Sequence, residues 1–199
     1  MPLAAGLTKF TTASPLIASF DWLDFATGAG YKSFYFLGIR DSTGNKYKLT
    51  QNSSISSASN NNYISTSSDV DFDLTFNNTI TIANAEATIT YFVDISSSGG
   101  IGIVWTVYHV DGKTSAETSL GTVTDESMGA AEDAKQTLIL TLARKVFKRG
   151  DILRVNSVIT SDTAAKFWFS PAGETSLVAE NTTTYTNSSS IDIPFEIQS

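Results

Sequence analysis

Carboxylate side chains alternate with apolar residues in the stretch DVDFDLTF, at Asp69, Asp71 and Asp73. Successive carboxylates on one strand face lie about 6.6 Å apart, and Ca²⁺ takes about six to eight oxygen ligands. A straight strand cannot wrap three carboxylates around one ion, so loop ligands such as Asp21 and Asp24 would have to join them. We expect the row to be a solvated strand edge that discourages pairing between molecules. A calcium site at Asp69, Asp71 and Asp73 is the alternative.

The single histidine, His109, is the next-to-last residue of the apolar run IGIVWTVYHV. A Ser-His-Asp relay needs this imidazole in a cleft beside an activated nucleophile, and no nucleophile motif accompanies it. A glycan-cleaving enzyme needs two carboxylates facing each other across about 5–9 Å, and no spacing identifies such a pair. We therefore predict a packed histidine, no catalytic residue, no cofactor and a protein that is not an enzyme.

The tripeptide Arg149-Gly150-Asp151 spells an adhesion signal within ARKVFKRGDILRVNSVIT. Gly150 suits a position where the chain turns sharply, and Asp151 can accept hydrogen bonds from nearby amides at a corner. An adhesion site needs a protruding loop, whereas strands are expected on both sides of this segment. We predict that Gly150 and Asp151 form a structural turn.

Two further features could contact a partner. A basic cluster stands out on the acidic chain and consists of Arg144, Lys145, Lys148 and Arg149. It is either a solvated link between strands or a docking site for an acidic partner surface. Trp168 lies between two phenylalanines that should face inward, so its indole is expected on the opposite face. There it could contact a subunit or a sugar ring, or pack under a loop.

Composition excludes several classes of function. The 199 residues carry a formal net charge of −7 and no cysteine, so phosphate backbones are repelled and thiol chemistry is absent. The N-terminal stretch MPLAAGLTKFTTASPLIASF lacks the basic start and continuous apolar run of a signal peptide. No window approaches the roughly 18 apolar residues of a membrane span. We expect neither a nucleic acid nor a membrane as partner.

The elements that must position these residues are strands. In DVDFDLTF the apolar side chains point one way and the aspartates the other, a period typical of a half-buried strand. Similar runs recur to the C-terminal SIDIPFEI, separated by turn signals such as the Asp-Gly of VDGK. About nine or ten strands at this spacing predict an all-β, antiparallel sandwich of the jelly-roll type. We expect an extended arm at 1–19 and one domain at 20–199.

The order of these runs carries a resemblance. DFDLTFNNTITIANAEATITY precedes WTVYHVDG, then LTLARKVFKRGDILRVNSVI, KFWFSPAG and SIDIPFEI. This order, over about residues 20–197, resembles jelly-roll structural proteins of tailed phages and related viruses, which decorate or complete a capsid. The resemblance implies a virion component, made in the host cytoplasm, that self-associates, often as a trimer, and binds the major capsid protein or other virion proteins. The arm at 1–19 could then reach a neighbouring subunit.

A second function stays open at this point. The chain could be a carbohydrate-binding β-sandwich, lectin-like or receptor-binding, that uses Trp168 and tyrosines such as Tyr63 and Tyr185. Exposed aromatic rings are suited to stacking on sugars. A glycan is therefore the alternative partner.

Overall fold

The structure is a computed structural model that describes residues 29–37, 46–52, 63–65, 69–95, 101–128, 133–159, 165–168, 175–176, 185–186 and 189–196. Every regular element in these ranges is a β-strand. They contain no helix with the length and hydrophobicity needed to cross a membrane. The predicted arm at 1–19 lies outside the described residues.

The strands vary from two to twelve residues in length. They are β1 (Ala29–Leu37), β2 (Lys46–Thr50), β3 (Tyr63–Ser65), β4 (Asp69–Thr75), β5 (Ile80–Ile82), β6 (Glu86–Ile95), β7 (Ile101–Val110), β8 (Glu117–Met128), β9 (Asp133–Thr141), β10 (Lys145–Phe147), β11 (Ile152–Ile159), β12 (Ala165–Trp168), β13 (Thr175–Ser176), β14 (Tyr185–Thr186) and β15 (Ser190–Glu196).

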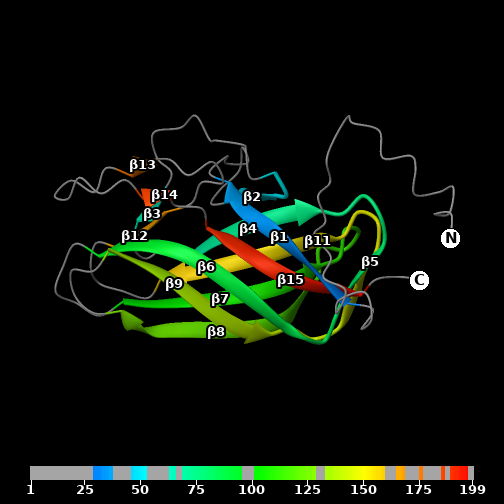
Figure 1. The fold of residues 1–199 in the computed structure, drawn as a ribbon. Helices are drawn as coiled ribbons and strands as arrows, with labels where there is room; N and C mark the ends of the chain where they lie inside the picture. The colour runs from blue at the N-terminus through cyan, green and yellow to red at the C-terminus, as the bar shows by residue number, and fades with distance from the viewer. Residues whose placement is uncertain are drawn as a thin grey trace, which may run out of the picture.

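Thirteen of these strands belong to one sheet, and its main path runs β3-β12-β6-β15-β1-β2-β4-β11-β7-β8. Strand β9 lies outside this path and pairs with β6. The sheet curls so that β8 and β9 approach each other, and it nearly closes into a barrel (Figure 1). The prediction of an all-β jelly-roll sandwich is confirmed. The sheet is mixed, however, because β2 and β4 run parallel while every other pair described is antiparallel.

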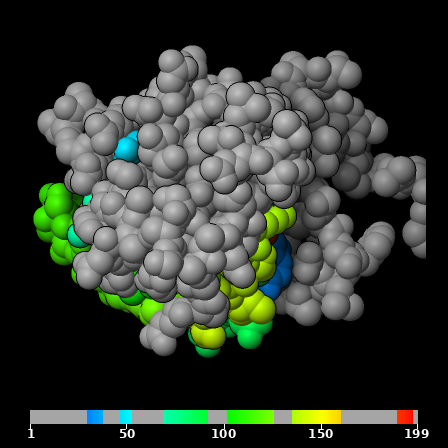
Figure 2. Space-filling model, turned by 90° about the vertical axis from the view of Figure 1, so that its left-hand side faces the viewer, coloured from blue at the N-terminus to red at the C-terminus, as the bar shows by residue number. Residues whose placement is uncertain are grey.

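The flattened barrel has two layers. Strands β1, β15, β6 and β9 form the layer in front in Figure 1, and β2, β4, β11, β7 and β8 form the layer behind it. Figure 2 shows the molecule from one end: blue β1 and yellow-green β9 reach the surface on one side, and green strand residues on the other. Each layer therefore has one face toward the core and one face outward.

The segment between β9 and β11 is more ordered than the sequence predicted. We expected a basic link there, but Lys145–Phe147 forms β10 and pairs with β5. The register of the β6–β9 pair, with Glu86 opposite Thr141, continues unchanged into the β5–β10 pair, with Ile82 opposite Lys145. The two pairs are thus one long ribbon with a single interruption, and the fully buried side chain of Phe147 anchors its end in the core.

The alternation read in DVDFDLTF is confirmed, but its place in the sheet is not that of an edge. Val70 and Phe72 are buried, as the two-residue period predicted. Strand β4 pairs with β2 on one side and with β11 on the other, so the expectation of a solvated edge at Asp69, Asp71 and Asp73 is wrong. The two-residue period shows which face of a strand is buried, but it does not show which strands lie beside it.

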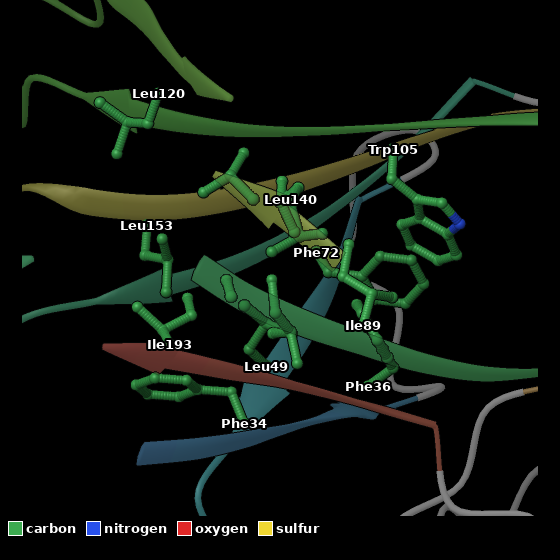
Figure 3. Close-up of a cluster of buried hydrophobic side chains, with 14 of the residues drawn as sticks. Phe34, Phe36, Leu49, Phe72, Ile89, Trp105, Leu120, Leu140, Leu153 and Ile193 are labelled. Atoms are coloured by element: carbon green, nitrogen blue, oxygen red, sulfur yellow. The ribbon is translucent and has the colours of Figure 1, made fainter. Parts of the chain in front are cut away.

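Aromatic rings fill the space between the layers (Figure 3). The ring of Phe36, from the front layer, lies 4.7 Å from that of Phe72 and 5.4 Å from that of Trp105, measured between ring centroids. All three side chains are completely buried, and each contributes roughly 1.5–3 kcal/mol by leaving water. Trp105 therefore belongs to the core of the fold.

Candidate functional site

The tripeptide Arg149-Gly150-Asp151 forms a tight corner between β10 and β11. Gly150 has a φ of 92°, in the left-handed region that glycine adopts at little cost. Its amide donates a hydrogen bond to the carbonyl of Phe76 at 2.8 Å, and the amide of Asp151 donates one to the carbonyl of Lys148 at 3.0 Å. The backbone of the tripeptide is therefore bound within the fold on both sides of the glycine.

The Asp151 carboxylate connects this corner to the hairpin between β7 and β8. It accepts hydrogen bonds from the amide of Lys148 at 2.8 Å and from the amide of Gly112 at 3.1 Å. The two turns also touch: a Cβ atom on Gly112 would lie 2.1 Å from the carbonyl oxygen of Gly150. Only glycine at position 112 permits this approach of backbone to backbone.

His109 completes the corner. Its Nε2 lies 2.8 Å from a carboxylate oxygen of Asp151, and both residues are buried. The ring of Phe147 packs edge-on against the imidazole at a centroid distance of 4.8 Å. Burial opposes ionisation of Asp151, but the hydrogen bonds from His109 and the two amides prevail and lower its pKa to about 2.

Among the described residues, no serine hydroxyl is hydrogen-bonded to His109 as the third member of a catalytic relay. The Nδ1 atom of His109 is buried, and within the described residues it has no hydrogen-bond partner. A serine hydroxyl in reach of the imidazole would be needed for acyl transfer. The pair His109–Asp151 thus closes a corner of the fold, and the sequence signal that pointed to it was the turn chemistry of Asp151 rather than the lone histidine.

The three aspartates of β4 are held by side chains of β11. Arg154 binds both carboxylate oxygens of Asp73, at 2.7 and 2.8 Å, and also contacts Asp71 at 3.2 Å. Asn156 donates to Asp69 at 2.6 Å and to Asp71 at 2.8 Å. Because the aspartates face these donors across the β4–β11 ladder, their mutual repulsion is offset within the fold.

Arg154 is the central group of this charged surface, and sequence reasoning missed it. Its guanidinium also donates to Glu117 of β8 at 2.5 Å, and its side chain is only 9% exposed. Hydrogen bonding to Asp73 outweighs burial and raises the pKa of the guanidinium above its usual value. No group of three or more His, Cys, Asp or Glu side chains in the described ranges could hold a metal ion. The calcium alternative therefore finds no support among the described residues.

The basic cluster divides into one paired residue and three others. Arg144 forms a two-point ion pair with Glu196 of β15, at 2.5 and 2.7 Å. Lys148 and Arg149 are exposed, and Lys145 is half-buried. The apolar side chain of Val146, between them, is 41% exposed. We call Lys145, Val146, Lys148 and Arg149 the basic corner.

Two of the three residues of the glycan alternative, Trp168 and Tyr63, lie opposite each other on neighbouring strands. The backbone of Trp168 pairs with Tyr63 of β3 and with Phe92 of β6, while Tyr185 belongs to the small β13–β14 sheet. The side chains of these residues, together with Asp21 and Asp24, lie outside the described part of the structure. The sugar-binding role predicted for Trp168, Tyr63 and Tyr185 stays a prediction.

A buried polar contact between the layers was not foreseen from the sequence. The hydroxyl of Tyr91 on β6 donates to the carboxylate of Asp125 on β8 at 2.6 Å, and both residues are buried. Burial, followed by this hydrogen bond, raises the pKa of the Tyr91 phenol above its usual value. Asp125 occupies an inward position of β8. An acidic residue among the apolar, inward residues of a strand is the sequence signal that could have predicted this buried hydrogen bond.

Comparison with known proteins identifies the fold but no family. No protein-family model matches the sequence, and no curated protein matches it. A hydrolase of the CocE/NonD family from Staphylococcus aureus has a similar structure, with a TM-score of 0.58 and 12% identity over 84% of this chain and 37% of the hydrolase. An aminopeptidase from a marine sediment archaeon, Thaumarchaeota archaeon, has a TM-score of 0.57 and 9% identity over 84% and 37%. An α-amino acid ester hydrolase has a TM-score of 0.56 and 11% identity over 82% and 36%.

These structures correct one expectation. The sequence predicted a protein that is not an enzyme, and this prediction is contradicted because the chain shares its fold with parts of hydrolases. The chain spans little more than a third of the length of each hydrolase. At such low identity the likeness shows the fold alone.

Proposed function

We propose that the protein is a structural component of a virus particle, a jelly-roll module that self-associates and attaches to a capsid shell. The observation that carries this proposal is the basic corner. Its cations lie on a chain whose net charge is −7, so the corner differs in sign from the molecule around it. A local patch of this kind attracts and orients an acidic partner surface.

The fold holds the basic corner rigidly. Strand β10 pairs with β5, and Phe147 is fully buried beside the exposed side chains. The carboxylate of Asp151 fixes the turn that follows through the amide of Lys148. Because the backbone is ordered before binding, attachment costs little conformational entropy. Val146 adds an apolar contact in the middle of the charges.

The experiment uses particles of the virus that carries this gene. The chain should be present in particles purified on a density gradient, and purified shells that lack it should take up the added wild-type chain. Arg149→Glu should weaken this uptake about tenfold or more, since a like charge now faces an acidic surface. Lys48→Glu, an equal charge reversal at an exposed position of β2 in the other layer, is the matched control and should bind as wild type. Absence of the chain from purified particles would refute the proposal.

A second candidate function follows from the comparisons. The chain could be the β-module of a hydrolase, because its fold matches parts of a CocE/NonD family hydrolase and an α-amino acid ester hydrolase. The test is the release of nitrophenol from amino acid nitrophenyl esters and of nitroaniline from aminoacyl nitroanilides. Hydrolysis by the purified chain above the buffer rate would favour this candidate. Hydrolysis equal to that of buffer would count against it.

A further inference from the structure

The outward face of the layer formed by β1, β15, β6 and β9 has an unusual composition, and we call it the hydroxyl face. Two rows of paired residues cross all four strands. The first row consists of Ser33, Asp192, Thr88 and Ile139. The second row consists of Tyr35, Ser190, Thr90 and Thr137. Six of these eight side chains carry a hydroxyl group, and one carries a charge.

Exposed apolar groups gather on the same face. The described part of the chain has three exposed large hydrophobic residues, and they are Tyr31, Ile139 and Val146. Ile139, 59% exposed, lies in the first row, and Tyr31, 53% exposed, lies on the same side of β1 as Ser33. The one charge in the rows, Asp192, is half-buried and accepts a hydrogen bond from the Ser33 hydroxyl at 2.5 Å.

The outward face of the other layer is different in kind. It carries the ion pairs of Arg154 with Asp71, Asp73 and Glu117. Exposed Glu86 and Lys135 flank the two rows on β6 and β9, so this face carries few charges and of both signs. Two copies of an acidic chain repel each other, and the repulsion is smaller where such a face meets its copy. A hydroxyl group is both a donor and an acceptor, so an array of hydroxyls is complementary to itself, whereas a row of carboxylates is not.

We propose that the hydroxyl face is the surface on which a second copy of this chain packs, face to face across a two-fold axis. The inference rests on the self-association in the proposed function and identifies its surface. In a two-fold contact the same patch serves both partners, which an array of hydroxyl and apolar groups with few charges permits. Ile139 and Tyr31 then leave water in the contact.

The size of the face sets the strength of the contact. Four strands about 4.8 Å apart, with about seven residues each at roughly 3.3 Å, give roughly 400 Å² per copy. Both copies together bury roughly 800 Å², below the roughly 1,200–2,000 Å² of a stable interface. The isolated chain should therefore associate reversibly and only at high concentration. Attachment of many copies to one shell would raise the effective concentration and strengthen the contact.

The first test is sedimentation velocity of the full chain over a wide concentration range. The wild-type chain should shift from monomer toward dimer as its concentration rises. Ile139→Lys should weaken this association about tenfold or more, because two lysines would approach across the axis. Val146→Lys places the same charge at an exposed apolar position of β10, outside the hydroxyl face, and should associate as wild type.

The second test uses the absence of cysteine from the sequence. A single cysteine is introduced in place of an exposed threonine, at Thr137 on the hydroxyl face or at Thr124 on the outward side of β8. Treatment with a bifunctional maleimide should give covalent dimers with Thr137→Cys and far fewer with Thr124→Cys. Equal yields for the two variants would overturn the inference even if the chain does associate.

The outcomes separate this inference from the proposed function. A dimer or trimer that survives Ile139→Lys overturns the hydroxyl face as the contact and leaves attachment to the shell untouched. A wild-type chain that stays monomeric at high concentration, with no preferential cross-linking at position 137, also overturns it. Binding of a glycan that is lost on Ile139→Lys, without self-association, would assign the face to a sugar instead of a second copy. Absence of the chain from particles bears on the proposed function alone.

Discussion

Replacing Asp151 by alanine should lower the free energy of unfolding by about 3–5 kcal/mol. The carboxylate, 6% exposed, accepts hydrogen bonds from the imidazole of His109 and from the amides of Lys148 and Gly112. A hydrogen bond to a charged group contributes about 1.5–3 kcal/mol when buried, and a donor left without its partner costs about 1–3 kcal/mol. Three such bonds would together exceed about 3–5 kcal/mol, and the partial exposure of the two amide bonds reduces the total to this range.

The assay is urea denaturation followed by tryptophan fluorescence. Arg149→Ala, two positions before Asp151 in the same corner, is the control and should change the free energy of unfolding by less than about 0.5 kcal/mol, as is usual for exposed side chains. A double-mutant cycle with His109→Ala should give a coupling energy of about 1–3 kcal/mol between the two side chains. A loss below about 1 kcal/mol for Asp151→Ala, or a coupling near zero, would refute the view that this carboxylate holds the two turns together.

Four further outcomes are expected. The pKa of Asp151 is about 2 in the fold against 3.8 when unperturbed. Its contribution to the free energy of unfolding is therefore complete above about pH 4 and is lost as the pH falls toward 2. The free energy of unfolding of Asp151→Asn should not show this decrease between about pH 4 and pH 2. Gly112→Ala should lower the melting temperature more than Gly150→Ala. The added Cβ would collide with backbone atoms at position 112, whereas at position 150 it meets nothing within 4 Å and only the positive φ costs about 1 kcal/mol. A larger decrease for Gly150→Ala would contradict the packing of the two turns. Arg154→Met should destabilise the fold by at least about 2 kcal/mol in urea, because the carboxylates around it lose their counter-charge, and a neutral result would show that solvent screens them. Tyr91→Phe should cost about 1–3 kcal/mol by removing the donor to a buried carboxylate, and unchanged stability would mean that another donor takes its place.

The alternation of apolar and polar residues in the sequence was sufficient to predict strands and their buried faces. Val70 and Phe72 lie inward because apolar side chains at alternate positions can leave water together only in an extended chain. Turn chemistry was equally informative, since the positive φ of Gly150 and the amide bonds of Asp151 follow from local rules for glycine and aspartate. The dimensions of a strand and a turn are set within a few residues.

Partners across strands could not be predicted. The alternation at Asp69, Asp71 and Asp73 predicted an edge strand. Arg154 and Asn156 lie opposite these aspartates on β11, more than eighty residues later, and nothing in the stretch itself indicates that pairing. The same holds for the bond between Tyr91 and Asp125 and for β10, whose pairing with β5 depends on a register set elsewhere in the ribbon.

The sequence alone determined that this chain would be helix-poor, layered and turned at Gly150, because each of these properties depends on neighbouring residues. Only the tertiary structure decided that one outward face would carry several ion pairs and the other many hydroxyl groups and few charges. That division depends on which strands meet and in which register. The energy that selects among registers is summed over the whole sheet, and no single stretch of the chain contains it.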